Sequence, residues 1–173
     1  MNGQGRYFGK FRGTVLVNID PLQKGRILAT VTDVAALTPT TWAMPCVPFA
    51  GIQAGVYVIP PVGAGVWIEF EQGNPDYPIW VGGFWGSAAE VPALALAPPP
   101  PPPGQNIVLQ TTLQNTLLIS DVPGPTGGIL LKTTTGALIA INDVGITISN
   151  GKGATIVMTG PTVTVNAGAL VVT

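Results

Sequence analysis

The chain has 173 residues, of which 46% are hydrophobic and only 9% are charged, and its formal net charge is −1. Average domains carry about 25% charged residues, so this composition indicates that much apolar surface is covered in an assembly. The small net charge excludes electrostatic attraction to nucleic acid or anionic membrane, and no apolar run approaches the ~20 residues of a membrane helix. We therefore expect neither a nucleic-acid partner nor stable membrane insertion.

The sequence also argues against an enzyme. It contains no histidine and a single cysteine, Cys46, which excludes an intrachain disulfide and leaves that thiol without an activating base. We expect Cys46 to be a small core residue. Glu69 and Glu71 stand two apart on one expected strand, which is typical of a solvated face. No set of nucleophile, base and orienting residue is present, so we predict no catalytic residues, no metal and no cofactor.

The chain begins with an expected arm, residues 1–11, which is rich in glycine and has basic and aromatic residues. A segment this short cannot bury enough apolar surface to fold alone, so we expect it to be flexible or bound to a partner. It lacks the apolar centre of a signal peptide, which predicts synthesis in the cytoplasm without one.

Residues 12–87 are expected to form a small five-stranded Greek-key barrel of the OB type, because short apolar runs alternate with turn signals. The expected strands are Arg12–Asn18, Arg26–Val31, Val56–Pro60, Val66–Glu71 and Pro78–Phe84. The expected core consists of Val15, Val17, Ile27, Ala29, Val31, Val58, Ile68, Phe70, Ile79 and Val81, and Val66 also points inward.

The turn between the first two expected strands has a specific chemistry. Pro21 fixes its own φ, Asp20 can accept hydrogen bonds from nearby backbone, and Gly25 suits a position of positive φ. We predict that Asp20, Pro21, Gly25 and Arg26 build a tight structural turn and have no catalytic role.

Residues 88–104 are expected to be a linker that contains six consecutive prolines, Pro98 to Pro103. Consecutive prolines adopt the stiff polyproline II conformation, so the run can act as a strut between the barrel and the C-terminal region. A generic spacer and a docking site for a proline-binding domain are the alternatives.

Residues 105–173 consist of short β-branched runs separated by Gly or Asn-Asp breaks, the pattern of short strands with two unlike faces. From Val91 onward the only charges are Asp121, Lys132, Asp143 and Lys152. Such a segment cannot cover its own apolar strands. We predict an intertwined trimeric β-prism or β-helix in which strands pair with and bury against those of other copies. Half of a β-sandwich is the alternative.

Several stretches of the barrel region resemble one known family. They are Gly13–Pro21, Lys24–Ile27, Trp42, Pro48–Gly51, Ile59–Gly65, Val66–Gly73 and Pro78–Trp85. In order and spacing they resemble the OB domain of contractile-injection spike proteins: phage baseplate spikes, the valine-glycine-repeat spikes of type VI secretion and the spikes of extracellular injection systems. The likeness covers roughly residues 5–86. The C-terminal region resembles the family only in its repetitive strands of Val, Ile, Thr and Gly.

The resemblance implies a structural central spike at the tip of the inner tube, used to pierce the target envelope. Hub domains precede the OB barrel in long spikes and are missing here, so the chain is similar to short spikes with a separate hub protein. Arg6, Tyr7 and Lys10 are then the hub-docking candidates. There is no room for a lysozyme domain, and without histidine the chain cannot bind iron at its own tip as some phage spikes do.

The resemblance also implies a tip partner, a small conical PAAR-repeat protein. The chain ends on an apolar strand whose nearest charge in sequence is Lys152, so neither charge nor proline guards the strand edge. An exposed apolar edge of this kind usually marks a partner site. The candidates for binding the tip protein are Ala169, Leu170, Val171, Val172 and Thr173.

Two other functions fit parts of the sequence. A trimeric fibre adhesin needs a receptor-binding head, and the chain ends without one. An OB-fold module that binds single-stranded nucleic acid or sugar needs a basic groove with stacking aromatic residues. The sequence has aromatic candidates, Trp42, Tyr57, Trp67, Trp80 and Trp85, but the basic residues gather at one end, at Arg6, Lys10, Arg12, Lys24 and Arg26.

Overall fold

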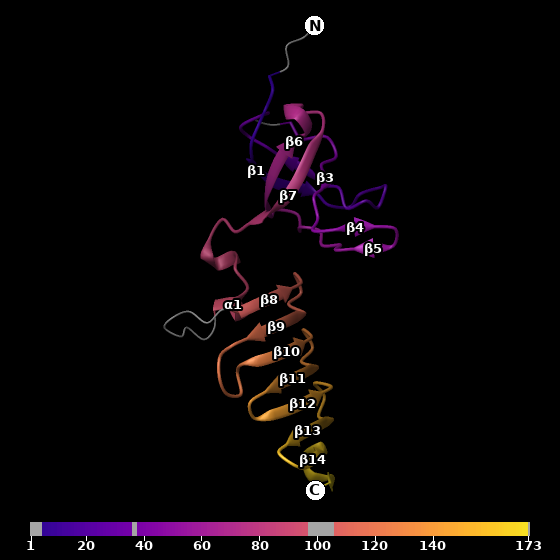
Figure 1. The fold of residues 1–173 in the computed structure, drawn as a ribbon, viewed down its shortest axis with the longest axis vertical. Helices are drawn as coiled ribbons and strands as arrows, with labels where there is room; N and C mark the ends of the chain where they lie inside the picture. Colours follow the sequence, from indigo (N-terminus) through magenta and orange to yellow (C-terminus); the bar gives the residue numbers. More distant parts are fainter. Residues whose placement is uncertain (1–4, 36–37, 97–105, 173) are drawn as a thin grey trace. The chain divides into compact units, whose positions relative to one another are not determined.

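The computed structural model describes residues 5–35, 38–96 and 106–172 of the chain. It divides into two compact units, Met1–Ala88 and Ala89–Thr173, and strands dominate both (Figure 1). The proline strut expected at Pro98–Pro103 lies outside the described residues.

The first unit is built on a five-stranded sheet. Its strands are β1 (Phe11–Val17), β2 (Leu28–Thr30), β3 (Met44–Pro45), β6 (Gly65–Phe70) and β7 (Pro78–Phe84), in the order β2-β1-β6-β7-β3. All pairs are antiparallel except β3 with β7. A bridge between Ile27 and Ala43 links the two outer strands and brings the sheet round into a barrel. This is the OB-type barrel that the sequence predicts.

The barrel core follows from period-two alternation. In β6 the side chains of Val66, Ile68 and Phe70 are buried, as predicted, while Trp67 and Glu69 face outward. The three buried side chains of β6 pack into one core cluster with apolar residues from elsewhere in the barrel. These are Val15, Ile27, Ala29, Val31, Ala43 and Trp80.

The core prediction for β7 was wrong by one residue. Pro78 and Trp80 are buried, whereas Ile79 and Val81 are only half-buried. Trp80 pairs directly with Ile68, and paired residues share a face of the sheet, so its ring points inward. The indole Nε1 donates a hydrogen bond to the carbonyl oxygen of Gly25 (3.1 Å), which allows a polar atom in the core.

The strand expected at Val56–Pro60 is absent from the structure. The chain forms instead a two-stranded hairpin just before it, β4 (Ala50–Gly51) with β5 (Ala54–Gly55). Val58 is therefore exposed and not in the core, and Val17, which follows a register shift at the end of β1, is exposed as well. Cys46 is exposed as well, because it lies just beyond the short outer strand β3. Short 3-10 turns follow β6 (η1, Glu71–Gly73) and β7 (η2, Ala88–Glu90).

The second unit is an eight-stranded antiparallel meander. A four-residue helix, α1 (Ala93–Leu96), precedes the strands, and a 3-10 turn, η3 (Asn166–Gly168), separates the last two. The strands are β8 (Asn106–Gln110), β9 (Thr116–Ser120), β10 (Gly128–Lys132), β11 (Leu138–Asn142), β12 (Gly145–Ser149), β13 (Thr155–Thr159), β14 (Thr162–Val165) and β15 (Leu170–Val172). Their order in the sheet is their order in the chain.

This topology corrects one expectation. The sequence predicts strands that pair with those of other copies, but each strand here pairs with its neighbours in its own chain. Tight turns between the strands make this local pairing easy. The interior hydrogen bonds of this sheet are therefore completed within one chain.

Candidate functional site

One face of the second unit's sheet is apolar along its length. In antiparallel strands, directly paired residues project from the same face, so the register places two columns side by side. One column consists of Ile107, Ile119, Ile129, Ile141, Ile146, Met158 and Val163. The other consists of Leu109, Leu117, Leu131, Ile139, Ile148, Ile156, Val165 and Leu170. We call this surface the apolar face.

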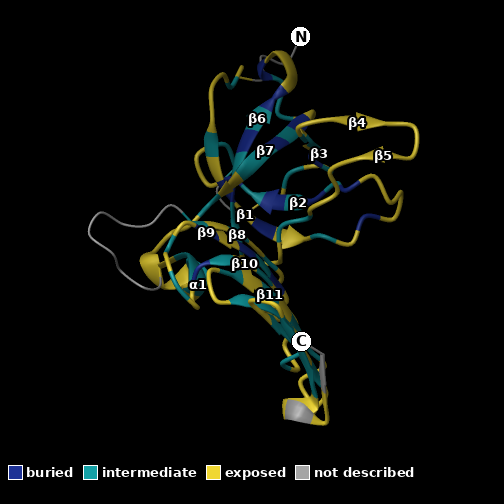
Figure 2. Cartoon of the chain, turned by 60° about the horizontal axis from the view of Figure 1, so that its bottom comes forward, coloured by how far each residue is buried: buried dark blue, intermediate teal, exposed yellow. Residues whose placement is uncertain are grey.

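The strands of this sheet are mainly intermediate or exposed in the single chain (Figure 2). Ile107 and Leu109 are 61% and 65% exposed, and Ile119, Ile129, Leu131, Ile139, Ile141, Ile148, Ile156 and Leu170 are exposed too. A continuous exposed apolar surface marks a site of association, because leaving it in water is unfavourable.

The opposite face has a different composition. Its central column is mixed, with Val108, Leu118, Leu130, Ala140, Thr147, Val157 and Thr164. Apart from Leu138 and glycines, the residues that flank that column on both sides are polar: Asn106, Gln110, Thr116, Ser120, Lys132, Asn142, Ser149, Thr155, Thr159 and Thr162. The two faces are thus chemically distinct, and the apolar face is the one that requires covering.

Hydrogen bonds link successive turns at both ends of the strands. In one row of turns, the side chain of Asn115 accepts a hydrogen bond from the backbone of Thr134 (3.1 Å), and Asn166 accepts one from Thr155 (3.0 Å). In the other row, Asp143 accepts a hydrogen bond from the backbone of Gly124 (2.7 Å). Successive turns are therefore linked to one another, and the sheet is well formed within one chain.

The Asp20 turn is held by a dense hydrogen-bond network. The Asp20 carboxylate accepts bonds from the backbone N–H groups of Leu22 (2.9 Å), Lys24 (2.8 Å) and Arg26 (3.3 Å). It also accepts from the Arg26 side chain, with Nη2 at 2.6 Å from Oδ1 and Nε at 3.0 Å from Oδ2. The Arg26 guanidinium lies 5.2 Å from the centre of the Trp42 ring. These contacts join the turn into one corner of the barrel.

The charges of this corner are stabilised by each other. The hydrogen bonds from the Arg26 side chain, with help from the backbone donors, hold the pKa of Asp20 far below its ordinary value, although burial opposes this. The same pairing raises the pKa of Arg26. Pro21 is exposed on the turn, and Gly25 has φ +76°, a conformation that favours glycine.

We expect the Asp20 pairing to make barrel stability depend on pH in acid. Because the folded-state pKa is lowered, the contribution is present above the unfolded pKa, about 3.9, and is lost as pH falls below it toward the folded value. In thermal melting, the midpoint of the wild type should fall more steeply below about pH 4 than that of Asp20→Asn. Parallel melting curves for the two proteins would contradict this assignment.

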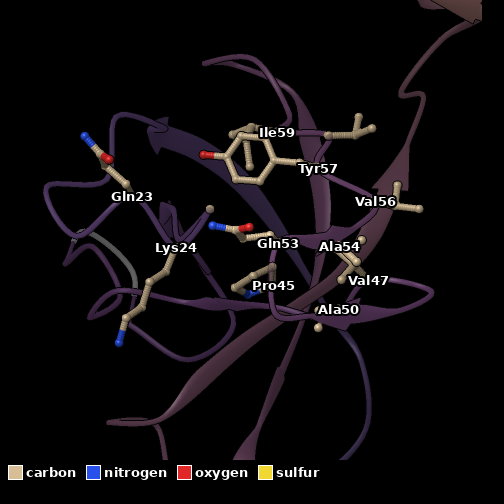
Figure 3. Close-up of a pocket in the computed structure, with 14 residues that line it drawn as sticks. Gln23, Lys24, Pro45, Val47, Ala50, Gln53, Ala54, Val56, Tyr57 and Ile59 are labelled. Atoms are coloured by element: carbon tan, nitrogen blue, oxygen red, sulfur yellow. The ribbon is translucent and has the colours of Figure 1, made fainter.

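A cavity of about 410 Å³ lies between this turn and the hairpin (Figure 3). The turn contributes Gln23, Lys24 and Gly25 to its lining, and Pro45 and Val47 line it as well. The rest of the lining consists of the hairpin residues Ala50, Gly51, Gln53, Ala54 and Gly55 and of Val56, Tyr57, Val58 and Ile59. Its lining is mainly apolar and offers no acid–base pair, so the cavity is suited to an apolar side chain.

The expected hub-docking residues lie on the barrel itself. The backbone N–H of Tyr7 donates to the carbonyl of Gly73 (2.9 Å), and its ring packs near Phe11 and Phe70. Arg6 donates to the carbonyl of Gln72 (3.0 Å), and Lys10 forms an ion pair with Glu69 (2.6 Å). The segment from Arg6 onward thus contacts its own barrel, whereas the sequence predicts an arm that is flexible or bound to a partner. Phe8, 68% exposed, was not among the sequence candidates.

The candidate tip residues stand at the last strand of the sheet. Ala169 and Leu170 are exposed, and within the described part of the chain β15 pairs with β14 alone, which leaves its other edge open there. Val171 and Val172 belong to β15, but their side chains and Thr173 lie outside what the structure describes.

Two family models match this chain. The type VI secretion system/phage-baseplate injector OB domain matches residues 11–85, which span the barrel. The phage baseplate V C-terminal trimerisation domain matches residues 106–171, which span the eight-stranded sheet. The chain belongs to the phage baseplate V family of spike proteins. No curated protein matches the chain.

The spike family accounts for the main features of both units. It is a structural family of the phage baseplate and the type VI injector, and it is not enzymatic. The apolar face lies within the trimerisation domain, which supports a homotrimer. Among the described residues, no cluster of three or more His, Cys, Asp or Glu is placed to bind a metal ion. No helix in the same residues has the length and hydropathy needed to span a membrane.

Proposed function

We propose that three copies of this spike form the rigid point at the end of the inner tube of a contractile injection machine, and that this point pierces the target envelope. The observation that carries the proposal is the apolar face, fifteen Ile, Leu, Val and Met side chains in two unbroken columns within a trimerisation domain. Three sheets with these faces turned inward make a closed β-prism with a continuous core.

The architecture of such a prism suits a piercing element. In a meander, each strand lies beside the next one in the chain, and the backbone hydrogen bonds point from strand to strand, along the direction in which the strands succeed one another. Compression along the stack is then resisted by many hydrogen bonds acting together with the linked turns. Burial of the apolar face at about 25 cal/mol per Å² would make the assembly resistant to heat and detergent.

The deciding experiment is the mass of the purified chain in solution. Light scattering should give three times the 17.7 kDa of one chain, and the species should persist in heat and detergent. A monodisperse monomer that keeps its β-structure would overturn the proposed function.

At the C-terminal end, we propose that β15 receives a PAAR-like tip protein through its open edge and exposed Leu170. Leu170 also ends the second column of the apolar face, so the test uses the exposed neighbour Ala169, which lies outside both columns. The change Ala169→Asp should remove the tip protein from purified particles, because the contact would bury an unpaired carboxylate. Lys152→Ala, at an exposed turn, is the control. Wild-type occupancy of the tip on an intact Ala169→Asp trimer would reject this site.

At the other end, we propose that Arg6, Tyr7 and Lys10, with the exposed ring of Phe8, present a docking surface to a separate hub protein. Tyr7 also supports the barrel, so the test changes exposed groups only. The double change Arg6→Glu with Phe8→Ser should reduce co-purification of the hub while the melting temperature stays near that of the wild type. Full retention of the hub would exclude this surface.

A further inference from the structure

The two ends of the barrel differ sharply in character. β1 and β7 run in the same direction and end at Val17 and Phe84, and β6 begins beside them at Gly65. The chain leaves the barrel here, so we call this the exit end. It carries the Asp20 turn and the whole segment Cys46–Ala64, which includes the β4–β5 hairpin.

The exit end gathers most of the exposed apolar side chains of the barrel. Fourteen large hydrophobic residues are exposed in the described part of the first unit, and all but Phe8, Met44 and Tyr77 belong to this end. They are Leu16, Val17, Ile19, Leu22, Phe49, Ile52, Val56, Tyr57, Val58, Val62 and Trp85. The segment Cys46–Gly65 contains no charged residue. Such a surface is suited to a protein partner.

The β4–β5 hairpin is not covered by its own barrel, and we call it the hairpin arm, or in this subsection simply the arm. The β4–β5 hairpin projects from the sheet (Figure 1), and every residue from Ala50 to Gly55 is exposed (Figure 2). Ile52, at its turn, is 99% exposed. Beside the arm lies the apolar cavity of about 410 Å³, with Tyr57 and Ile59 on its wall (Figure 3). One barrel thus carries both a projecting apolar side chain and a hollow suited to one.

We propose that the exit ends of the three barrels bind one another, with Ile52 of one copy seated in the cavity of the next. The inference rests on the proposed trimer. A ring of three identical copies requires two different complementary patches on each copy, and the arm and the hollow supply them. A contact of this kind closes after three steps and leaves neither patch exposed.

Connectivity identifies the occupant as a second copy. The chain runs from the exit end into its trimerisation domain, and only residues 86–105 separate Trp85 from β8. At about 3.3–3.6 Å per residue, this tether holds the three exit ends within roughly 70 Å of a common anchor. Short tethers raise the effective concentration to about the millimolar range, where modest apolar contacts are occupied.

Thiol labelling of the full chain tests the inference. In a Cys46→Ser background, Ile52→Cys provides a thiol at the arm, and Tyr77→Cys provides a control thiol at the opposite end of the barrel, where Tyr77 is 59% exposed. Each cysteine variant is reacted with a maleimide in two forms. One form keeps Ile148 and is trimeric, and the other also carries Ile148→Asp, which dissociates the trimer. Because labelling of a seated arm requires local opening, Ile52→Cys should react about ten-fold more slowly, or slower still, in the trimer. Tyr77→Cys should react equally in both.

The outcomes separate this inference from the proposed function. A trimer in which Ile52→Cys reacts as fast as it does in the dissociated background would overturn the barrel contact alone. A purified chain that is monomeric before any substitution would overturn the proposed function and the barrel contact together.

Discussion

Replacement of Ile148 by aspartate should dissociate the trimer. Ile148 lies in the second column of the apolar face, paired with Ile139 and Ile156 and flanked by apolar neighbours along the whole sheet. In a closed prism the three new carboxylates would be buried together without partners. The desolvation of each unpaired charge costs several kcal/mol, which exceeds what the remaining contacts of one strand supply. The mass measured by light scattering should fall to that of a single chain.

The adjacent residue provides the matched control. Thr147 is in the same strand, and its side chain projects from the opposite face, where it pairs with Ala140 and Val157. Thr147→Asp adds the same charge in the same strand, so any general effect on strand formation is shared. We expect this variant to remain trimeric. Equal dissociation of both variants would show that the apolar face is not the buried one.

The second large effect is expected at Gly128, where β10 begins. Its φ is +78°, and a Cβ there would overlap the carbonyl oxygen of Ile141 in the neighbouring strand. Gly128→Ala therefore combines backbone strain with a clash against backbone that cannot move without breaking the β10–β11 pairing. We expect a loss of about 3 kcal/mol or more in stability, measured by denaturant unfolding of the assembled chain.

Gly136 provides a control that separates the backbone strain from the clash with the neighbouring strand. Its φ of +90° is similar, but the nearest atom to an added Cβ is 3.9 Å away, an ordinary contact. Gly136→Ala should therefore cost only about 1–2 kcal/mol, from the conformational strain alone. If the two alanine variants unfold at the same denaturant concentration, the close approach at Gly128 has no energetic importance.

Features that depend on neighbours in sequence were predictable from the sequence. Alternation in Val66–Phe70 predicts the buried face of β6, and the turn chemistry of Asp20 and Gly25 predicts a tight corner with positive φ at the glycine. The low charge after Val91 predicts that the C-terminal region is covered in an assembly. The resemblance to injection spikes, carried by the barrel stretches, agrees with the two matched families.

Features that depend on distant contacts were decided only by the tertiary structure. Trp80 enters the core because its indole reaches the carbonyl of Gly25, 55 residues away in sequence, and this displaces Ile79 and Val81 from the predicted positions. Arg6 donates a hydrogen bond to the carbonyl oxygen of Gln72, 66 residues away, and this contact attaches part of the N-terminal segment to the barrel. Local patterns carry no information about such partners.

The apolar face shows the same division most clearly. Each strand's alternation could be read from the sequence, but alternation alone does not say which strands are neighbours or in what register they pair. A shift of one residue would move every side chain of a strand to the other face. The meander and its register align Ile139, Ile148 and Ile156 with the rest of two continuous columns. The sequence thus determined that the region must associate, and the pairing of its strands determined the surface that does so.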